Sequence, residues 1–288
     1  MKTFFKWTLG IFVFFFTAAI MSGLIQDKLK NSKSEIALVH VNGILMDSSE
    51  IVRKLSKYRR DSKIKAIIVR IDSPGGAVGP AQEIYDEINR IKESQKIVYA
   101  SLGSVAASGG YYIACAADYV LANPGTLTGS IGAIMAFNNV EELAKKIGVR
   151  PAVIKSGKFK DSGSPLRSLE PKERKLLQNV VDDVHQQFVK AISLGRKLPE
   201  EKVKQFADGR VMTGKQALDF KLIDEFGGLE KTIELLGKKI GIDGYPSVLE
   251  EKEKVPFMDW LMQSFVSKNL TQSVLPATGS RLQYIWFP

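Results

Sequence analysis

The sequence predicts an α/β fold preceded by one N-terminal transmembrane helix. Three observations lead to this fold class. Short, β-branched apolar runs alternate with amphipathic helical patterns along most of the chain, glycine-rich turns directly follow apolar runs, and an uncharged apolar stretch stands near the N-terminus. Of the 288 residues, 44% are hydrophobic and 25% are charged, which is typical of a globular protein and excludes extended disorder as the default.

The N-terminal stretch 8–26 contains no charged residue and follows two lysines, Lys2 and Lys6. As a helix its nineteen residues would rise roughly 28 Å, close to the hydrocarbon thickness of a bilayer. A cleaved signal peptide is the alternative, but its apolar core is typically shorter. We therefore expect a membrane anchor over residues 1–26, followed by a charged tether over residues 27–35.

One core domain is expected over residues 36–243. Its predicted strands are apolar on both faces, as in sheets covered by helices; they are residues 36–41, 66–71, 96–101, 119–122, 133–136 and 152–155. Helical patterns lie between and after them at residues 79–94, 140–148 and 171–194. This alternation indicates an α/β architecture.

Residues 244–288 are expected to form a C-terminal arm. A charge run at 248–256 is typical of a solvated linker, and residues 257–270 place four apolar side chains on one helical face that must bury against something. Packing on the core or on another subunit is the simpler interpretation. A helix lying on the membrane is the alternative.

The formal net charge is +10, from 41 basic and 31 acidic residues. The lysines are scattered and accompany no aromatic recognition pattern, so we expect no nucleic-acid partner. A basic surface facing anionic lipid explains the charge more simply. The single cysteine, Cys115, excludes an intrachain disulfide and lies among small apolar residues, so it is expected to be a buried core thiol.

Ser108 is the candidate nucleophile. It follows a predicted strand and begins the helical run "GGYYIACAA", so it lies at a helix N-terminus, where unpaired N–H groups favour developing negative charge. The same position suits an ordinary N-cap serine. Gly109 favours the catalytic interpretation, because glycine lets the main chain approach a substrate and offer its N–H to an oxyanion.

A second glycine turn, "DSPGG" at residues 72–76, comes directly off the strand 66–71. Glycines often serve only to turn the chain at a strand end. Their alternative use is to expose N–H groups at the carboxyl edge of the sheet, where open α/β folds bind ligands. Two such turns would complete an oxyanion hole.

The general base is less clear from the residues alone. His40 lies in an apolar strand and is most simply a core or sheet-face residue, whereas His185 falls on the polar side of a helical stripe and is expected to face solvent. A lysine can serve if burial or neighbouring positive charge lowers its pKa from about 10.4 to near neutrality. Lys155, Lys158 and Lys160 lie in one glycine- and serine-rich loop, and composition does not choose among them.

Taken together, the motifs resemble the signal peptide peptidase A family. They are "DSPGG", "AASGGYYIA", "TGSIG", "KSGKFKDSGSPLR", "DGRVMTGKQAL" and "LIDEFGG", in this order, and the resemblance covers roughly residues 36–243. It implies a fold of repeated ββα units, as in Clp proteases and crotonases, and a membrane-anchored serine protease with a Ser/Lys dyad that degrades remnant signal peptides. It requires no metal or cofactor.

Carried over by position, the resemblance assigns the nucleophile to Ser108 and the general base to Lys160. It assigns the serine that hydrogen-bonds the lysine amine to Ser130, and the oxyanion donors to Gly109 and Gly76, with Gly75 less favoured.

The resemblance also implies a setting. It places the chain in the bacterial cytoplasmic membrane, as a single-pass protein with its catalytic domain on the extracytoplasmic side. The chain has one serine motif and one lysine motif, as in the short members, which form rings. We therefore expect a ring-shaped homo-oligomer whose active sites are shared between neighbours. An extended peptide substrate would pair with a strand edge beside the glycine turns.

Two other classes of protein remain open from the sequence. A crotonase-like acyl-CoA enzyme would share the architecture but has no use for a membrane span, and a non-catalytic membrane scaffold would need neither Ser108 nor Lys160. One departure from the family pattern is Lys221, which stands before "LID" where glycine is usual. If that position requires positive φ, lysine costs roughly 1 kcal/mol there.

Overall fold

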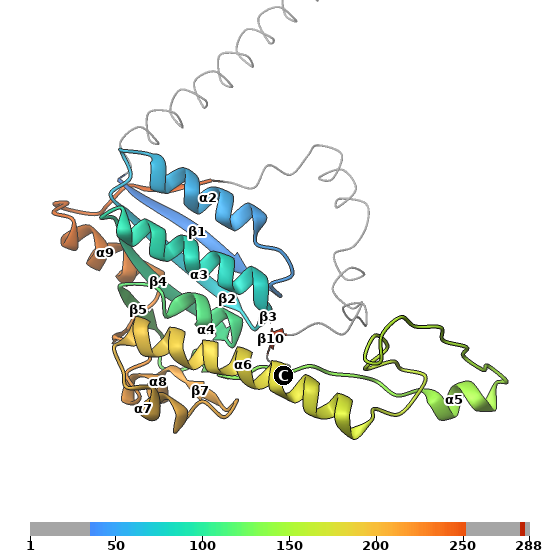
Figure 1. Cartoon of the computed structure of the whole chain (residues 1–288). Helices are drawn as coiled ribbons and strands as arrows, with labels where there is room; N and C mark the ends of the chain where they lie inside the picture. The colour runs from blue at the N-terminus through green and yellow to red at the C-terminus, as the bar shows by residue number, and fades with distance from the viewer. Residues whose placement is uncertain (1–34, 252–282, 286–288) are drawn as a thin grey trace, which may run out of the picture.

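The computed structural model describes residues 35–251 and 283–285, and its centre is a mostly parallel sheet (Figure 1). Strands β1 (Ile36–Asn42), β2 (Ala66–Ser73), β4 (Ile97–Ala107) and β5 (Tyr119–Ala122) run parallel in neighbouring positions. The C-terminal half of β4 pairs in parallel with β6 (Leu127–Gly129). The described strands of this sheet follow the order β7-β6-β4-β2-β1-β9, with β5 and β8 branching from β4. The predicted α/β class is confirmed.

The short strands complete the sheet at its edges. β7 (Val211–Thr213) is antiparallel to β6, whereas β8 (Glu225–Phe226) is parallel to β5 and β9 (Val248–Glu250) is parallel to β1. A separate pair is formed by β3 (Gly75–Ala77) and β10 (Gln283–Ile285), which run antiparallel.

Helices cover both faces of the sheet because its strands are apolar on both sides. Alternate residues of β1, such as Val39, face the cluster that contains Leu55 of α2 (Ser49–Arg60) and Ile84 of α3 (Val78–Glu93). The other set, such as Leu38, packs with Leu236 of α9 (Leu229–Lys239). Period-two alternation in a doubly covered strand requires this arrangement.

Four more helices of the described chain belong to the core: α4 (Gly109–Ala114), α6 (Pro171–Arg196), α7 (Glu200–Lys204) and α8 (Gly214–Asp219). Helix α4 follows Ser108 directly, and the other three come from the C-terminal half of the domain. Phe188 of α6 is fully buried, and Glu170 with Glu173 forms a capping box at the start of this helix. Cys115 is fully buried, and burial raises the pKa of its thiol to about 12, so the expected core thiol is confirmed.

Residues 133–169 leave the sheet after β6 and project past its edge (Figure 1). We call these residues the arm; they are distinct from the predicted C-terminal arm at 244–288. The arm carries one short helix, α5 (Glu141–Lys146), within the predicted range 140–148. The strands predicted at 133–136 and 152–155 are wrong, because neither range forms a β-strand. Within the described residues Ile134 forms only an isolated bridge, and the side chain of Ile154 is fully exposed.

The predicted anchor and most of the tether, as well as the helix predicted at 257–270, lie outside the described residues. Within the part of the chain that the structure describes, no helix is both long and apolar enough to cross a bilayer.

Candidate active site

Ser108 lies at the junction between β4 and α4 in an unusual backbone conformation. Its φ is 54° and its ψ is −118°, a region that costs a non-glycine residue of order 1–3 kcal/mol. Although Ser108 is the N-cap of α4, its side chain makes no capping hydrogen bond. The alternative interpretation as an ordinary N-cap is therefore wrong, because the Ser108 hydroxyl accepts no hydrogen bond from the first turn of α4.

The strand β6 holds the serine junction from one side and brings Ser130 next to it. The N–H of Ser108 donates to the carbonyl of Gly129 at 2.8 Å, and the hydroxyl of Thr128 donates to the carbonyl of Ala106 at 2.6 Å. Ser130 follows directly, buried and with φ of 49°, and its N–H donates to the carbonyl of Arg210 at 2.8 Å. Two sequence-predicted site residues, Ser108 and Ser130, are thus brought to one place.

The two glycine turns meet beside Ser108. A Cβ placed on Gly109 would lie 3.2 Å from the Cα of Gly75 and 3.4 Å from the N of Gly76. Only residues without side chains allow two main chains to approach this closely. The N–H of Gly75 donates to the Ser73 hydroxyl at 3.1 Å, which makes Gly76 the better second donor for an oxyanion. The predicted neighbourhood of both turns is therefore present.

Lys160 is not brought to Ser108 within this chain. Lys160 lies exposed on the arm, where its backbone N–H donates to the carbonyl of Gly157 at 3.1 Å. Among the described residues, no hydrogen bond or ion pair joins Lys160 to Ser108 or Ser130. The other two candidates have local contacts, since Lys155 pairs with Asp161 at 2.5 Å and the Lys158 amine lies 5.6 Å from the ring centre of Phe159.

An ion-pair cluster fixes the loop that carries Lys160. Asp161, the next residue, accepts from the Arg167 guanidinium at 2.9 Å, and the same guanidinium makes two bonds to the buried carboxylate of Glu173 at 2.5 and 2.8 Å. These hydrogen bonds with Arg167 lower the pKa of Glu173 to about 2 and hold the pKa of Asp161 well below its ordinary value. Because Glu173 belongs to α6, the cluster ties the lysine loop to that helix.

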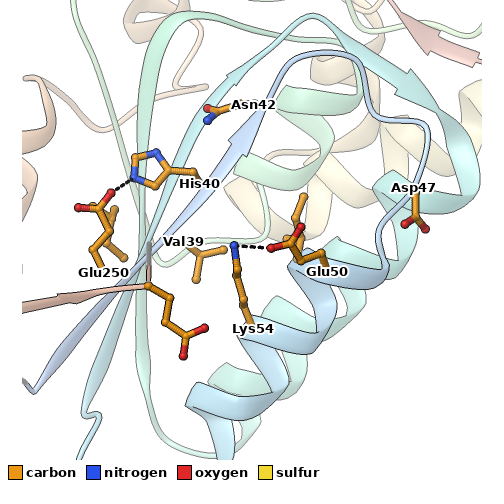
Figure 2. Close-up of a pocket in the computed structure, with 10 residues that line it drawn as sticks. Val39, His40, Asn42, Asp47, Glu50, Lys54 and Glu250 are labelled. Atoms are coloured by element: carbon orange, nitrogen blue, oxygen red, sulfur yellow. Dashed lines mark hydrogen bonds and ion pairs between the residues drawn. The ribbon is translucent and has the colours of Figure 1, made fainter. Parts of the chain in front are cut away.

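Both histidines lie in other surroundings. His40 Nε2 pairs with Glu250 at 2.8 Å and lines an open pocket between α2, β1 and β9 (Figure 2). His185 was expected to face solvent, but its Nε2 is buried and has no hydrogen-bond partner among the described residues. The expectation is wrong for this ring nitrogen, and the residue as a whole is half-buried because it lies next to the buried Val184 on α6.

Sequence reasoning missed one segment of the site, the strand β10. It lies antiparallel to β3 with Tyr284 opposite Gly76, so a C-terminal segment sits directly at the glycine turns. The aromatic and β-branched run "YIWF" was the only local signal for a strand there.

A strained serine at a strand-to-helix junction, with two glycine turns facing it at the edge of a parallel sheet, defines a serine hydrolase of the α/β class. Residues 90–243 match peptidase family S49, and residues 27–128 match the Clp protease family. The chain belongs to peptidase family S49 and is a serine protease.

Individual relatives agree with this assignment. The chain is 44% identical over 214 residues to "Putative protease slr0021" of Synechocystis, covering 74% of this chain and 77% of that protein. It is 32% identical over 240 residues to "Putative signal peptide peptidase SppA" of Enterococcus faecium, covering 79% and 69%. It is also 36% identical over 251 residues to the chloroplastic serine protease SPPA of Arabidopsis thaliana, covering 82% of this chain and 34% of that longer protein.

Proposed function

We propose that this protease is an endopeptidase with a Ser/Lys dyad, in which Ser108 is the nucleophile and Lys160 the general base. The observation that carries the proposal is the backbone of Ser108, which is strained and buried and leaves its hydroxyl unused by the helix that it caps. Strain of this kind persists where it serves a function. The close approach of Gly76 and Gly109 supplies the second requirement, a place for the oxyanion.

The proposed reaction follows from these positions. The Ser108 oxygen attacks the peptide carbonyl carbon while the neutral Lys160 amine takes the hydroxyl proton, and the N–H groups of Gly109 and Gly76 stabilise the negative oxygen. The protonated amine then gives its proton to the departing peptide nitrogen, which leaves an acyl-enzyme. Water, deprotonated by the same amine, hydrolyses this ester and restores Ser108. The Ser130 hydroxyl orients the amine.

The lysine must then come from a neighbouring copy of the chain. Lys160 lies on the arm, which projects from the subunit (Figure 1) and exposes many large apolar side chains. These are Ile134, Val140, Leu143, Ile147, Val149, Val153, Ile154 and Phe159. An apolar surface of this extent is typical of an interface. We infer that the arm packs on the next subunit of a ring and delivers Lys160 to that subunit's Ser108, since head-to-tail contacts close into a ring when the rotation between subunits permits.

The proposed substrates are remnant signal peptides in the membrane, and the proposed location is the bacterial cytoplasmic membrane with the catalytic domain outside the cytoplasm. The support is the apolar stretch 8–26, which would keep the protease beside such peptides, and the similarity to a protein named signal peptide peptidase. An extended apolar peptide would pair with β3 at the glycine turns in the position that β10 occupies in this chain.

The nucleophile is tested by covalent labelling with a fluorophosphonate and by peptide hydrolysis. Ser108→Ala should lose both while keeping its thermal melting temperature within a few degrees. Ser104→Ala is the matched control, because Ser104 is an exposed serine on the same strand, and it should keep both. Labelling or hydrolysis retained by Ser108→Ala would contradict the assignment.

The shared site is tested by complementation. Ser108→Ala and Lys160→Ala chains, each inactive alone, are unfolded together, reassembled and assayed with a fluorogenic peptide. Random mixing should restore about a quarter of the sites, since half of the serines and half of the facing lysines are intact. Verified mixed rings without recovery would show that the dyad forms within one chain.

A further inference from the structure

The parallel strands of the main sheet all begin at one edge, which lies opposite the edge that carries Ser108. β1 begins at Ile36, β2 at Ala66, β4 at Ile97 and β5 at Tyr119. Helices α2, α3 and α9 end at the same edge, because β2, β4 and β9 follow them in the chain. We call this the starting edge; it consists of the strand starts, the three helix ends and the loops between them.

Basic side chains gather at the starting edge. The last turns of the three helices and the loops after α2 and α3 contribute Lys57, Arg59, Arg60, Lys63, Lys65, Arg90, Lys92, Lys96, Lys238 and Lys239. A cation at a helix C-terminus complements the helix dipole, which explains part of this set. The loop lysines at 63, 65 and 96 lie beyond the helices, so the dipole does not account for them.

Part of this charge is neutralised within the chain, and part is not. Lys57 pairs with Glu251, Lys65 pairs with Glu35, and Glu87 takes both Arg59 and Arg90. The exposed carboxylates Glu93 and Asp243 offset some of the remainder. Four exposed cations form no ion pair with any described residue, and these are Arg60, Lys63, Lys238 and Lys239.

A pocket opens at the same edge between α3, α9 and the starts of β4 and β5. Its lining includes Lys92, Lys96, Asp118, Lys239 and the rings of Tyr99 and Tyr119, which stack with centroids 5.2 Å apart. The Lys96 amine donates to two main-chain carbonyls, so one of its three donors is left for a ligand. The Asp118 carboxylate is occupied, since it accepts the N–H of Val98 at 2.8 Å. Lysines around tyrosine rings suit the headgroup region of a bilayer.

The sequence brings the predicted anchor to this edge. Residues 27–34 separate the apolar stretch 8–26 from Glu35, which directly precedes β1. A chain of this length spans at most roughly 30 Å, so the starting edge lies within reach of the membrane surface. Lysines 28, 30 and 33 add positive charge between the two. Each basic residue close to an anionic membrane favours binding roughly fivefold.

We propose that the starting edge is a docking face for anionic phospholipid, with a headgroup phosphate held in the pocket by Lys96 and Lys239. The inference rests on the proposed membrane location and is independent of the chemistry of Ser108. Docking stands the strands on the bilayer surface. The eleven residues of β4 then hold Ser108 roughly 35 Å from the headgroups, at the far edge of the sheet.

The test uses the full chain inserted in lipid nanodiscs of phosphatidylcholine alone, or of an equal mixture with phosphatidylglycerol. Ser62→Cys, on the exposed loop after α2, carries a nitrobenzoxadiazole label, and a lipid with a nitroxide headgroup quenches any label at the bilayer surface. Cys115 does not take the label because it is fully buried. Ser104→Cys is the matched position, since Ser104 is exposed near the opposite end of β4.

We expect quenching at position 62 to be at least threefold greater with phosphatidylglycerol than without it, and to disappear in molar salt. Position 104 should stay unquenched in both lipids. Reversing Arg60, Lys63, Lys238 and Lys239 to Glu should abolish quenching at position 62. The matched reversal of Lys175 and Lys190, two exposed lysines of α6, should leave it unchanged.

A milder variant guards against misfolding of the fourfold reversal. Lys63→Gln combined with Lys239→Gln should lower the ratio of docked to undocked protein roughly 25-fold. Equal quenching in the two lipids, or quenching that survives these changes, would overturn the proposal. A chain that does not stay with the nanodiscs would instead refute the proposed membrane location, and this inference with it. Hydrolysis of a water-soluble peptide should be equal in all variants, so failure of the Ser108 assignment is detected separately.

Discussion

Gly75 offers a sharp test of the glycine turns, because the structure gives it two separate reasons to lack a side chain. Its φ is +96°, and a Cβ would lie 2.6 Å from the N of Gly109 besides clashing with the Tyr284 carbonyl oxygen. Positive φ alone costs an L-residue roughly 1–2 kcal/mol. A methyl group against the N of Gly109 would also block a proposed oxyanion donor, and loss of one such donor costs about 10²–10³ in kcat.

We therefore expect Gly75→Ala to lower kcat at least 100-fold and to lower the free energy of unfolding by at least about 2 kcal/mol, because the backbone clashes add to the cost of positive φ. Gly79→Ala is the matched control, because a Cβ on this α3 residue would meet nothing within 4 Å. It should keep kcat and change the free energy of unfolding by less than about 1 kcal/mol, because Gly79 lies in the first turn of α3 before Pro80. The assays are steady-state hydrolysis of a fluorogenic peptide and urea unfolding followed by circular dichroism. A Gly75→Ala protein with kcat within threefold of the parent would refute the reasoning.

Two further predictions concern a strained turn and an ion-pair cluster. Lys221 has φ of 62°, so Lys221→Gly should raise the free energy of unfolding by about 0.5–1 kcal/mol in a urea titration, and a loss of stability would contradict the strain argument. The pKa of Glu173 in the folded chain is about 2, below its ordinary 4.5, so its pairing with Arg167 contributes above pH 4.5 and is lost as the pH falls towards 2. Hydrogen exchange of residues 157–169, corrected for the intrinsic rate, should therefore accelerate between pH 5 and pH 2.5, and Arg167→Met should show fast exchange already at pH 7. Equal corrected rates at both pH values would show that the cluster does not hold the loop.

Much of the core could be predicted because its signals are local. The strand 119–122 has its predicted bounds, and the helix predicted at 79–94 is α3, Val78–Glu93. A buried strand or a helix can be recognised from the periodicity of its own apolar residues and from the residues that flank it. The glycine turns were also placed correctly beside Ser108, since parallel strands bring their carboxyl ends to one edge of the sheet.

What the sequence did not show depends on partners far away along the chain. β3 and β10 are three residues each and stand some two hundred residues apart, so neither has a periodic signal and nothing local reveals their pairing. In the arm, β-branched runs such as 152–155 suggested strands, but an apolar run shows only that burial is needed and not which structure provides it. For the same reason the proposal that Lys160 is the general base rests on the family resemblance. Composition gave no indication that Lys160 makes no contact with Ser108 within the described part of one chain.

The backbone of Ser108 has a consequence for attempts to make this enzyme more heat-resistant. Glycine adopts φ of 54° with ψ of −118° at little steric cost, whereas serine carries a penalty at that position. Among single substitutions, Ser108→Gly is therefore a simple way to gain stability, and it removes the hydroxyl. A library screened for survival of heating alone would enrich dead enzyme, so directed evolution of this scaffold has to select for cleavage in every round.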